Sequence, residues 1–218
     1  MLIFAYLSML IDHIGVIFFP NEIIFRIIGR LALPIFAIRL TQGYKYTKNI
    51  YHYATRILIL GIISQPIYYL TFGHESLFFP LNICFTLGFG LILIHFLEKI
   101  KEYNKILFYI VFLTIIFTSF HIPFEYGTYG ILMILFVYYL KEKPIEFLGL
   151  FSLNTFIFAS HYSQSIQYIP IFLFPFLLYF DEKKFLNIDM KVLGFKYAHY
   201  LFYPLHLLLL YIIKILYV

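Results

Sequence analysis

Long apolar runs recur from one end of the sequence to the other, and they limit the fold more than any other feature. Hydrophobic residues make up 62% of the 218 residues, whereas charged residues make up only 12%. A soluble domain of this length has no use for so much apolar surface, while a helix that crosses a bilayer needs about 20 apolar residues. Because backbone polar groups must be satisfied within lipid, the sequence predicts an all-α polytopic membrane bundle that forms a single domain, 1–218.

The basic residues sort cleanly between the connections of this predicted bundle. We place nine membrane spans, at 2–19, 23–40, 55–72, 81–98, 106–120, 127–141, 145–160, 167–180 and 198–217. Lysine and arginine occur in every second connection and are absent from the others. The positive-inside rule then puts the amino terminus in the cytoplasm and makes the chain a multi-pass protein of the cell membrane. We expect the first span to be retained, because no basic region precedes residues 2–11 and no cleavage site follows them.

The first two spans carry ionisable side chains where lipid disfavours them. Asp12 and His13 lie in the first apolar run, and Arg26 and Arg30 lie in the second. Charges inside a span are costly, so they usually face the bundle interior and mark a site. A helix rises about 1.5 Å per residue, which puts His13 and Arg30 each roughly 10 Å from the turn at 20–22. We therefore expect these two side chains at a similar depth in the membrane.

These residue types suit proton transfer and the binding of negative charge. A histidine accepts and returns a proton near neutral pH, and Asp12 either orients His13 or pairs with another span. Arg26 and Arg30 are four residues apart and share a helix face. Buried guanidinium groups suit a carboxylate, a phosphate or a developing oxyanion. The structural alternative is a salt bridge, such as Asp12 with Arg30, that only holds two helices together.

Other polar residues are further candidates for the functional site. A basic cluster at the cytoplasmic end of the second and third spans suits a phosphorylated cofactor, although ordinary topology signals explain it equally well; it comprises Arg39, Lys45, Lys48 and Arg56. Pro204 breaks the helical hydrogen bonding of the last span near His206, which is either a functional residue or a packed core residue. For the remaining intramembrane groups we favour hydrogen bonds between helices; they are Ser64, Gln65, Asn82 and Thr86.

Several function classes are disfavoured by the composition. The single cysteine, Cys84, excludes an internal disulfide and a site with several thiolate ligands. The histidines are scattered without metal-ligand spacing, so we predict no metal. The net charge of +5 is first a topology signal in a membrane protein, and we predict no nucleic-acid partner.

The motifs MLIDHIGVIFFP, FRIIGRLALPIFAIRLTQGYKYTKN, RILILGIISQPIYYL and LNICFTLGFGL resemble the TraX family. That family is named for a conjugal-transfer protein that acetylates the amino terminus of pilin. The resemblance covers the chain to about residue 99 and then becomes compositional, apart from YGTYGILMILFVYYL and the final FYPLHL. FYPLHL is also similar to the closing span of the type-three membrane acyltransferases.

The resemblance implies a membrane-embedded acetyltransferase. The acyl donor would be acetyl-coenzyme A from the cytoplasm. The acceptor would be an amine or hydroxyl at or beyond the outer face, on a pilin amino terminus or a cell-surface glycan. His13 matches the histidine expected to be catalytic as general base, and Arg30 matches the arginine of the second-span motif. Gln42 stands where the family more usually has Glu, so this chain lacks that acid.

Two other functions compete with the enzyme. A transporter or flippase would use the same buried charges as a proton or anion path. The two halves of the chain do not resemble each other, which weighs against transporters built from repeats. A non-catalytic scaffold has little reason to bury so many charges. Release of thiol from acetyl-coenzyme A by the purified protein would separate the three.

Overall fold

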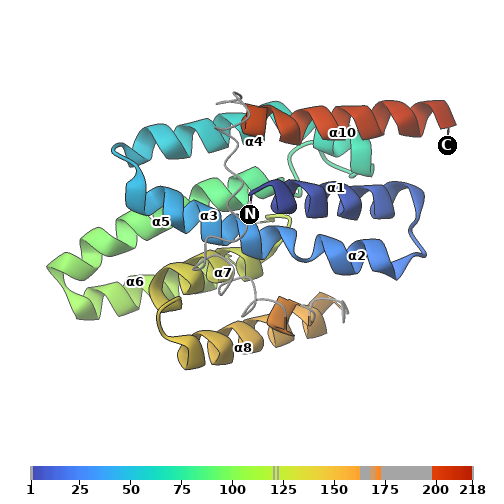
Figure 1. Cartoon of the computed structure of the whole chain (residues 1–218). Coiled ribbons are helices and arrows are strands. Elements are labelled where there is room, and N and C mark those ends of the chain that lie inside the picture. The colour runs from blue at the N-terminus through green and yellow to red at the C-terminus, as the bar shows by residue number, and fades with distance from the viewer. Residues whose placement is uncertain are drawn as a thin grey trace.

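Helices form the whole framework of the part of the chain described by the structure. This computed structural model describes residues 2–119, 121, 123–162, 168, 170–172 and 198–217. Within them Figure 1 shows the helices α1 (Leu2–Phe18), α2 (Ile23–Gly29), α3 (Ala32–Tyr46), α4 (Ile50–Phe72), α5 (Ile83–Tyr103), α6 (Lys105–Ser119), α7 (Gly127–Leu140), α8 (Pro144–Tyr162) and α10 (Ala198–Tyr217). The prediction of an all-helical fold is confirmed over these residues.

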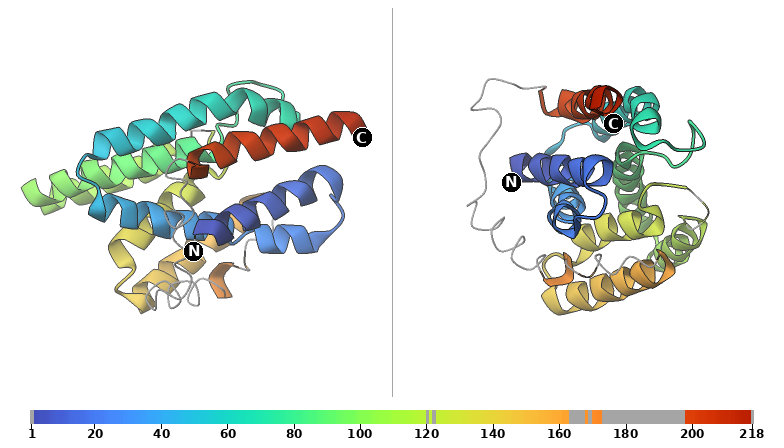
Figure 2. Two further views of the ribbon diagram at one scale, coloured as in Figure 1. Left: turned by 45° about the horizontal axis from the view of Figure 1, so that its top comes forward. Right: turned by 90° about the vertical axis from the view of Figure 1, so that its right-hand side faces the viewer.

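The helices pack as one bundle in which the first three helices lie in the middle. Helix α1 packs against α2, α3 and α10, while α3 also contacts α5 and α7. Helix α4 lies between α5 and α10. Helices α10 and α8 lie at opposite edges of the bundle, as Figures 1 and 2 show. The first and last described helices are therefore neighbours, although most of the chain separates them.

Membrane character is evident in the length and exposure of the helices. Helices α4 and α5, and residues Tyr200–Tyr217 of α10, are long and apolar enough to cross a membrane. Shorter apolar helices cover Leu2–Phe18, Lys105–Thr118, Gly127–Leu140 and Pro144–Ser160. Large apolar side chains such as Leu113, Phe117 and Leu209 are exposed on the outside of the bundle, where lipid would contact them. The chain therefore has the character of a multi-helix membrane protein.

The connections are distributed between two ends of the bundle. The connections α3–α4, α5–α6 and α7–α8, which carry the lysines, lie at one end in Figure 1. The α1–α2 turn, which has no basic residue, lies at the other end. If the basic connections alternate along the chain, they must lie at one end of the bundle, as they do here. Which end faces the cytoplasm stays a prediction.

The second predicted span, 23–40, is wrong as a single helix. It is divided into α2 and α3, with Arg30 and Leu31 at the break. Pro34 stands in the first turn of α3 and has no N–H to donate to the carbonyl of Arg30, so a continuous helix would lose a hydrogen bond there. The eighth predicted span, 167–180, lies mostly outside the described residues. The other predicted spans correspond to described helices within a few residues.

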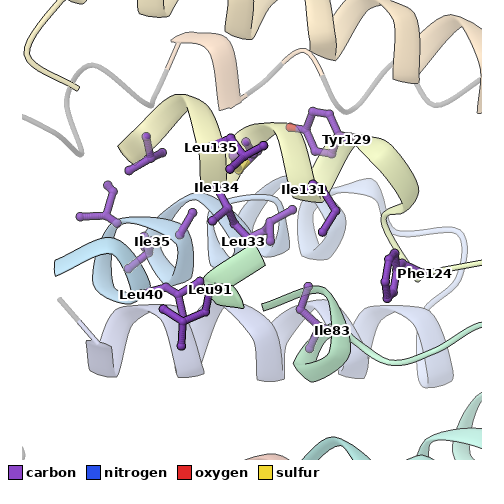
Figure 3. Close-up of a cluster of buried hydrophobic side chains, with 14 of the residues drawn as sticks. Leu33, Ile35, Leu40, Ile83, Leu91, Phe124, Tyr129, Ile131, Ile134 and Leu135 are labelled. Atoms are coloured by element: carbon purple, nitrogen blue, oxygen red, sulfur yellow. The ribbon is translucent and has the colours of Figure 1, made fainter. Parts of the chain in front are cut away.

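Aliphatic side chains from α3, α5 and α7 form the centre of the bundle. Figure 3 shows Leu33 and Ile35 of α3 beside Ile134 and Leu135 of α7. Leu91 of α5 joins them and is fully buried. Because lipid tails are as apolar as these side chains, close van der Waals packing, and not removal from water, holds the helices together here. This core supports the break between α2 and α3, and so it fixes the position of Arg30.

Candidate functional site

A cavity of about 240 Å³ lies where α1, α2 and α4 meet the connections on either side of α5 and α6. Polar and ionisable side chains make up much of its wall. The lining residues are Asp12, His13, Val16, Arg26, Arg30, Tyr68, Phe72, His74, Pro80, Glu125, Tyr126 and Phe158. All three predicted catalytic residues, Asp12, His13 and Arg30, are among them. The structure thus brings these three residues to one cavity, and their catalytic roles stay a prediction.

Close contact between α1 and α2 builds the first part of the site. Gly29 of α2 has no Cβ, and the carboxyl group of Asp12 occupies the space where a Cβ would lie. One turn earlier on α1, the Ser8 hydroxyl donates to the carbonyl of Ile28 at 2.6 Å. The same carbonyl accepts from the N–H of Leu31 at 3.2 Å, so Ser8 adds a second donor to it at the break between α2 and α3. Helix α1 is thereby fixed in register against α2.

Asp12 is bound by both arginines of α2, but not equally. Nη1 of Arg26 donates to Oδ2 of Asp12 at 2.8 Å, whereas Nη1 of Arg30 lies 3.8 Å from Oδ1. The predicted pair of Asp12 with Arg30 is thus the longer of the two ion pairs. Arg30 is 6% exposed, and its Nε has no hydrogen-bond partner among the described residues. A buried donor without a partner is costly, and it suits a ligand or reacting group with negative charge.

His13 is connected to the last helix through His206. Nδ1 of His206 lies 2.8 Å from the carbonyl oxygen of Phe202, and Nε2 of His206 lies 2.9 Å from Nδ1 of His13. A carbonyl only accepts, so in the neutral pair Nδ1 of His206 donates and its Nε2 is left to accept. Nδ1 of His13 must then donate to His206. This order leaves Nε2 of His13 with the lone pair, as a general base requires.

The connection before α7 brings Glu125 into the cavity. The N–H of Glu125 donates to the carbonyl of Leu81 at 2.9 Å, and the N–H of Leu81 donates to the carbonyl of Pro123 at 2.9 Å. These main-chain bonds join two connections and hold the Glu125 carboxyl beside Asp12 and Arg30. Burial and the Asp12 charge raise the pKa of Glu125 to about 7, although Arg30 and a hydrogen bond from the backbone of Ile83 lower it.

The predicted cofactor residues lie away from this cavity. Arg39, Lys45, Lys48 and Arg56 do not line it. Arg39 donates to Oε1 of Gln42 at 2.8 Å, and the Arg56 guanidinium lies 6.0 Å from the ring of Tyr200. Sixteen residues of α4 separate Arg56 from Phe72 at the cavity, or roughly 24 Å of helix. The cluster and the cavity therefore lie at different depths of the bundle.

Two of the remaining predicted polar residues, Gln65 and Asn82, join α4 to the start of α5 by the hydrogen bonds that their favoured structural role required. Nδ2 of Asn82 donates to Oε1 of Gln65 at 2.7 Å and to the carbonyl of Gly61 at 2.9 Å. Nε2 of Gln65 donates to the carbonyls of Leu77 and Pro80. Ser64 and Thr86 are buried nearby, and their hydroxyl oxygens have no partner among the described residues. This network is outside the cavity, but Gln65 holds the connection that supplies Pro80 to its wall.

Sequence reasoning did not select four polar residues of the wall: Tyr68, His74, Glu125 and Tyr126. His74 and Glu125 belong to connections that carry no basic residue, which was a signal that they lie at the same end. Their approach to Asp12 depends on the main-chain pairing of Leu81 with the segment before α7. That pairing has no motif in the sequence.

The sequence of this chain matches a known protein family. A family model described as TraX protein matches residues 1–214. The chain belongs to the TraX family. The match includes every residue that lines the cavity, His13 and Arg30 among them.

The chain is also similar to two individual proteins. The chain is 28% identical over 234 residues to a probable fimbrial assembly protein, FimC, of Dichelobacter nodosus, covering 95% of this chain and 91% of that protein. It is 43% identical over 61 residues to an uncharacterized protein of Rickettsia prowazekii (strain Madrid E), covering 28% of this chain and 23% of that protein. No solved structure matches this TraX-family chain.

Proposed function

We propose that this TraX-family chain is a membrane-embedded acetyltransferase. It moves the acetyl group of acetyl-coenzyme A to an amine or hydroxyl of an extracytoplasmic acceptor. The observation that carries the proposal is the hydrogen-bonded series from Phe202 through His206 to His13, which leaves a basic ring nitrogen at a cavity lined by two arginines. Membership of the TraX family supports the same reaction class.

The residues of the cavity suit each step of acyl transfer. Nε2 of His13 takes the proton of the acceptor as its nitrogen or oxygen attacks the thioester carbon. Negative charge then develops on the carbonyl oxygen, and the buried guanidinium of Arg30 stabilises it. When the carbon–sulfur bond breaks, His13 returns the proton to the leaving thiolate. Asp12 keeps Arg26 and Arg30 in place and balances part of their charge.

The cavity is too small to enclose the whole acetyl-coenzyme A molecule, which supports placing its two ends in different regions of the protein. A volume of about 240 Å³ is below the range of roughly 300–1,000 Å³ for pockets that enclose a drug-sized ligand. The cavity therefore suits the acetyl thioester and the reacting end of the acceptor, and the nucleotide of acetyl-coenzyme A would lie outside it. The basic cluster of Arg39, Lys45, Lys48 and Arg56 is the proposed place for the nucleotide phosphates, reached by the extended arm of the donor.

The proposed acceptor is a pilin or fimbrial subunit, with a cell-surface glycan as the alternative. A relative similar over most of both chains is named as a probable fimbrial assembly protein. The cavity is bordered by connections without basic residues, which the positive-inside rule assigns to the outer face. An acceptor anchored in the membrane with its reactive group outside would reach the cavity from that side.

The test is acetyl transfer by the purified, membrane-reconstituted chain. Thiol release from acetyl-coenzyme A and acetylation of a peptide with a free amino terminus are measured together. His13→Ala is expected to lower turnover by roughly 100- to 10,000-fold, the usual contribution of a positioned base. The matched control is His95→Ala, because His95 is half-buried beside Tyr44 and does not line the cavity. Near-normal transfer by His13→Ala, in protein that unfolds at the same temperature, would reject the proposed mechanism and favour the transporter.

A further inference from the structure

Glu125 is an acidic residue of the cavity whose side chain is only partly used by the fold. The backbone of Ile83, at the start of α5, hydrogen-bonds its carboxyl group. Its Oε2 is buried and has no hydrogen-bond partner among the described residues. Because main-chain bonds to Leu81 fix the segment that carries Glu125, this free oxygen has a defined position in the cavity wall.

The other carboxyl group of the cavity, Asp12, also has one oxygen, Oδ1, without a hydrogen-bond partner among the described residues, but it is held in two ion pairs. Asp12 contacts Arg26 at 2.8 Å and Arg30 at 3.8 Å. Protonating it would leave two neighbouring guanidinium groups without a counter-charge. Glu125 faces the same charges from α1 and α2, but no ion pair within 4.0 Å binds it among the described residues. Glu125 is therefore the acid of this site that is available to exchange a proton.

An amine acceptor needs two proton acceptors, whereas a hydroxyl acceptor needs one. Amino groups of peptides have a pKa of roughly 8, so they reach the site mainly as ammonium at neutral pH. The ammonium must lose one proton to become a nucleophile and a second proton as it attacks the thioester. His13 accepts one proton on Nε2 and has no further capacity, because its Nδ1 donates to His206.

We propose that Glu125 is the second proton acceptor of the site: it binds the ammonium group of the acceptor and takes its first proton, which makes the site suited to a primary amine. The inference rests on the proposed acetyl transfer and adds a residue and an acceptor class to it. The ammonium and the Glu125 carboxylate become an amine and a carboxylic acid. The amine nitrogen then attacks the thioester carbon, its proton passes to His13, and the carbon–sulfur bond breaks. Coenzyme A leaves as the thiol with the proton from His13, and Glu125 returns its proton to water.

The electrostatic surroundings of Glu125 fit this role. Burial and the nearby Asp12 raise its pKa to about 7, within roughly one unit of a peptide amino group. Proton transfer between groups of similar pKa costs little, so Glu125 could deprotonate the ammonium without becoming too weak to bind it. The charged groups around it are Asp12 on α1, Arg26 on α2 and Arg30 at the end of α2. The other titratable groups that interact with it are Tyr68 on α4, Cys84 on α5, Tyr126 before α7 and Tyr203 on α10.

The experiment compares two small amines that differ in protonation. Glycinamide is mainly an ammonium ion near neutral pH, whereas acetohydrazide carries a terminal amine that is already neutral. The variant is Glu125→Gln, because the amide oxygen keeps an acceptor for the backbone of Ile83 but cannot take a proton. Wild type, Glu125→Gln and the exposed control Glu75→Gln are assayed for acetylation of both amines in the reconstituted full chain.

Because about a tenth of an amine with a pKa of roughly 8 is already free at pH 7, Glu125→Gln is expected to lower kcat/KM for glycinamide about 10-fold at that pH. It should change kcat/KM for acetohydrazide by less than about threefold. Raising the pH should restore glycinamide transfer in the variant, because free amine then replaces ammonium. Glu125→Asp, which retains a carboxylate set back by one methylene, should fall between wild type and Glu125→Gln.

Three results would overturn the inference. Equal losses for both amines would show that Glu125 acts only on the structure, and unchanged transfer to glycinamide would show that it takes no proton. A defect that persists at high pH would also contradict the role. Failure of wild type to acetylate either amine is a distinct result, because it rejects the proposed acetyl transfer itself and with it this role for Glu125.

Discussion

Nδ1 of His13 lies 2.9 Å from Nε2 of His206, although 193 positions separate the two residues in the chain. The two rings have nearly the same orientation, with 13° between their planes. The contact joins the first helix to the last described helix, and it decides which nitrogen of His13 carries a proton. The site therefore depends on both ends of the described chain.

His206 should be replaceable only by a residue that accepts a hydrogen bond from His13. His206→Leu is expected to lower kcat by about 10- to 100-fold, part of the roughly 100- to 10,000-fold that a positioned base contributes. His206→Gln offers an amide oxygen to Nδ1 of His13 and should recover most of the lost rate. Steady-state kinetics with acetyl-coenzyme A test this, with KM expected to stay the same. Equal defects in the two variants would mean that His206 only fills space.

Gly29 should not tolerate a methyl group. A Cβ at this position would overlap the carboxyl group of Asp12, so α1 and α2 would have to separate. We expect Gly29→Ala to lower the free energy of unfolding by about 1–3 kcal/mol, as overpacking does. The matched control is Gly149→Ala on α8, where a Cβ would meet nothing within 4 Å and alanine favours the helix. Thermal unfolding in detergent measures both, and equal midpoints for the two variants would contradict the close contact.

Glu125 should make the stability of the protein depend on pH. Its pKa in the folded chain is raised to about 7, above an ordinary value of 4.5, so folding favours the protonated form. This contribution is fully present below about pH 4.5 and is lost as the pH rises through 7, by on the order of 3 kcal/mol at most. Unfolding midpoints of wild type and Glu125→Gln, measured between these two pH values, isolate the contribution of Glu125 to stability. The prediction fails if the difference between the two proteins does not change with pH.

The basic cluster should affect donor binding rather than the chemical step. Lys45 and Lys48 are both exposed, so neutralising them with Lys45→Gln and Lys48→Gln should leave the fold intact. Each exposed contact contributes at most about 1 kcal/mol, so losing both should raise KM for acetyl-coenzyme A by up to about 30-fold with kcat unchanged. The exposed pair Lys99 and Lys105, at the α5–α6 connection, is the control. If both double variants behave alike, these lysines determine topology and do not bind the donor.

The part of the site that was predictable from sequence is the part made by neighbouring helices. His13 and Arg30 flank one short turn, so their distance from it gives their depth without knowledge of the rest of the fold. The closer partner of Asp12 was not predictable in the same way, because Arg26 and Arg30 are four residues apart and this spacing does not rank their distances to Asp12.

Contacts between segments that are far apart in the sequence could not be predicted from it. His206 was a candidate because of the nearby proline, but its bond to His13 depends on α10 packing against α1. Glu125 lies in a connection without basic residues, and no motif in the sequence marks it. Its place in the cavity follows from two backbone hydrogen bonds between Leu81 and the segment before α7, and backbone pairing of this kind is independent of side-chain identity.

The contacts of Ser8 and Asp12 with α2 have a consequence for the order in which the protein is made. Both residues bind α2 within the first 30 residues, so this hairpin can assemble as soon as those residues have left the ribosome. His206 is synthesised far later, and until it arrives nothing in the hairpin sets which nitrogen of His13 is protonated. A nascent chain would thus carry the arginines and the histidine already in place but lack a defined base. Under the proposed mechanism, catalytic competence would be acquired only when α10 enters beside α1.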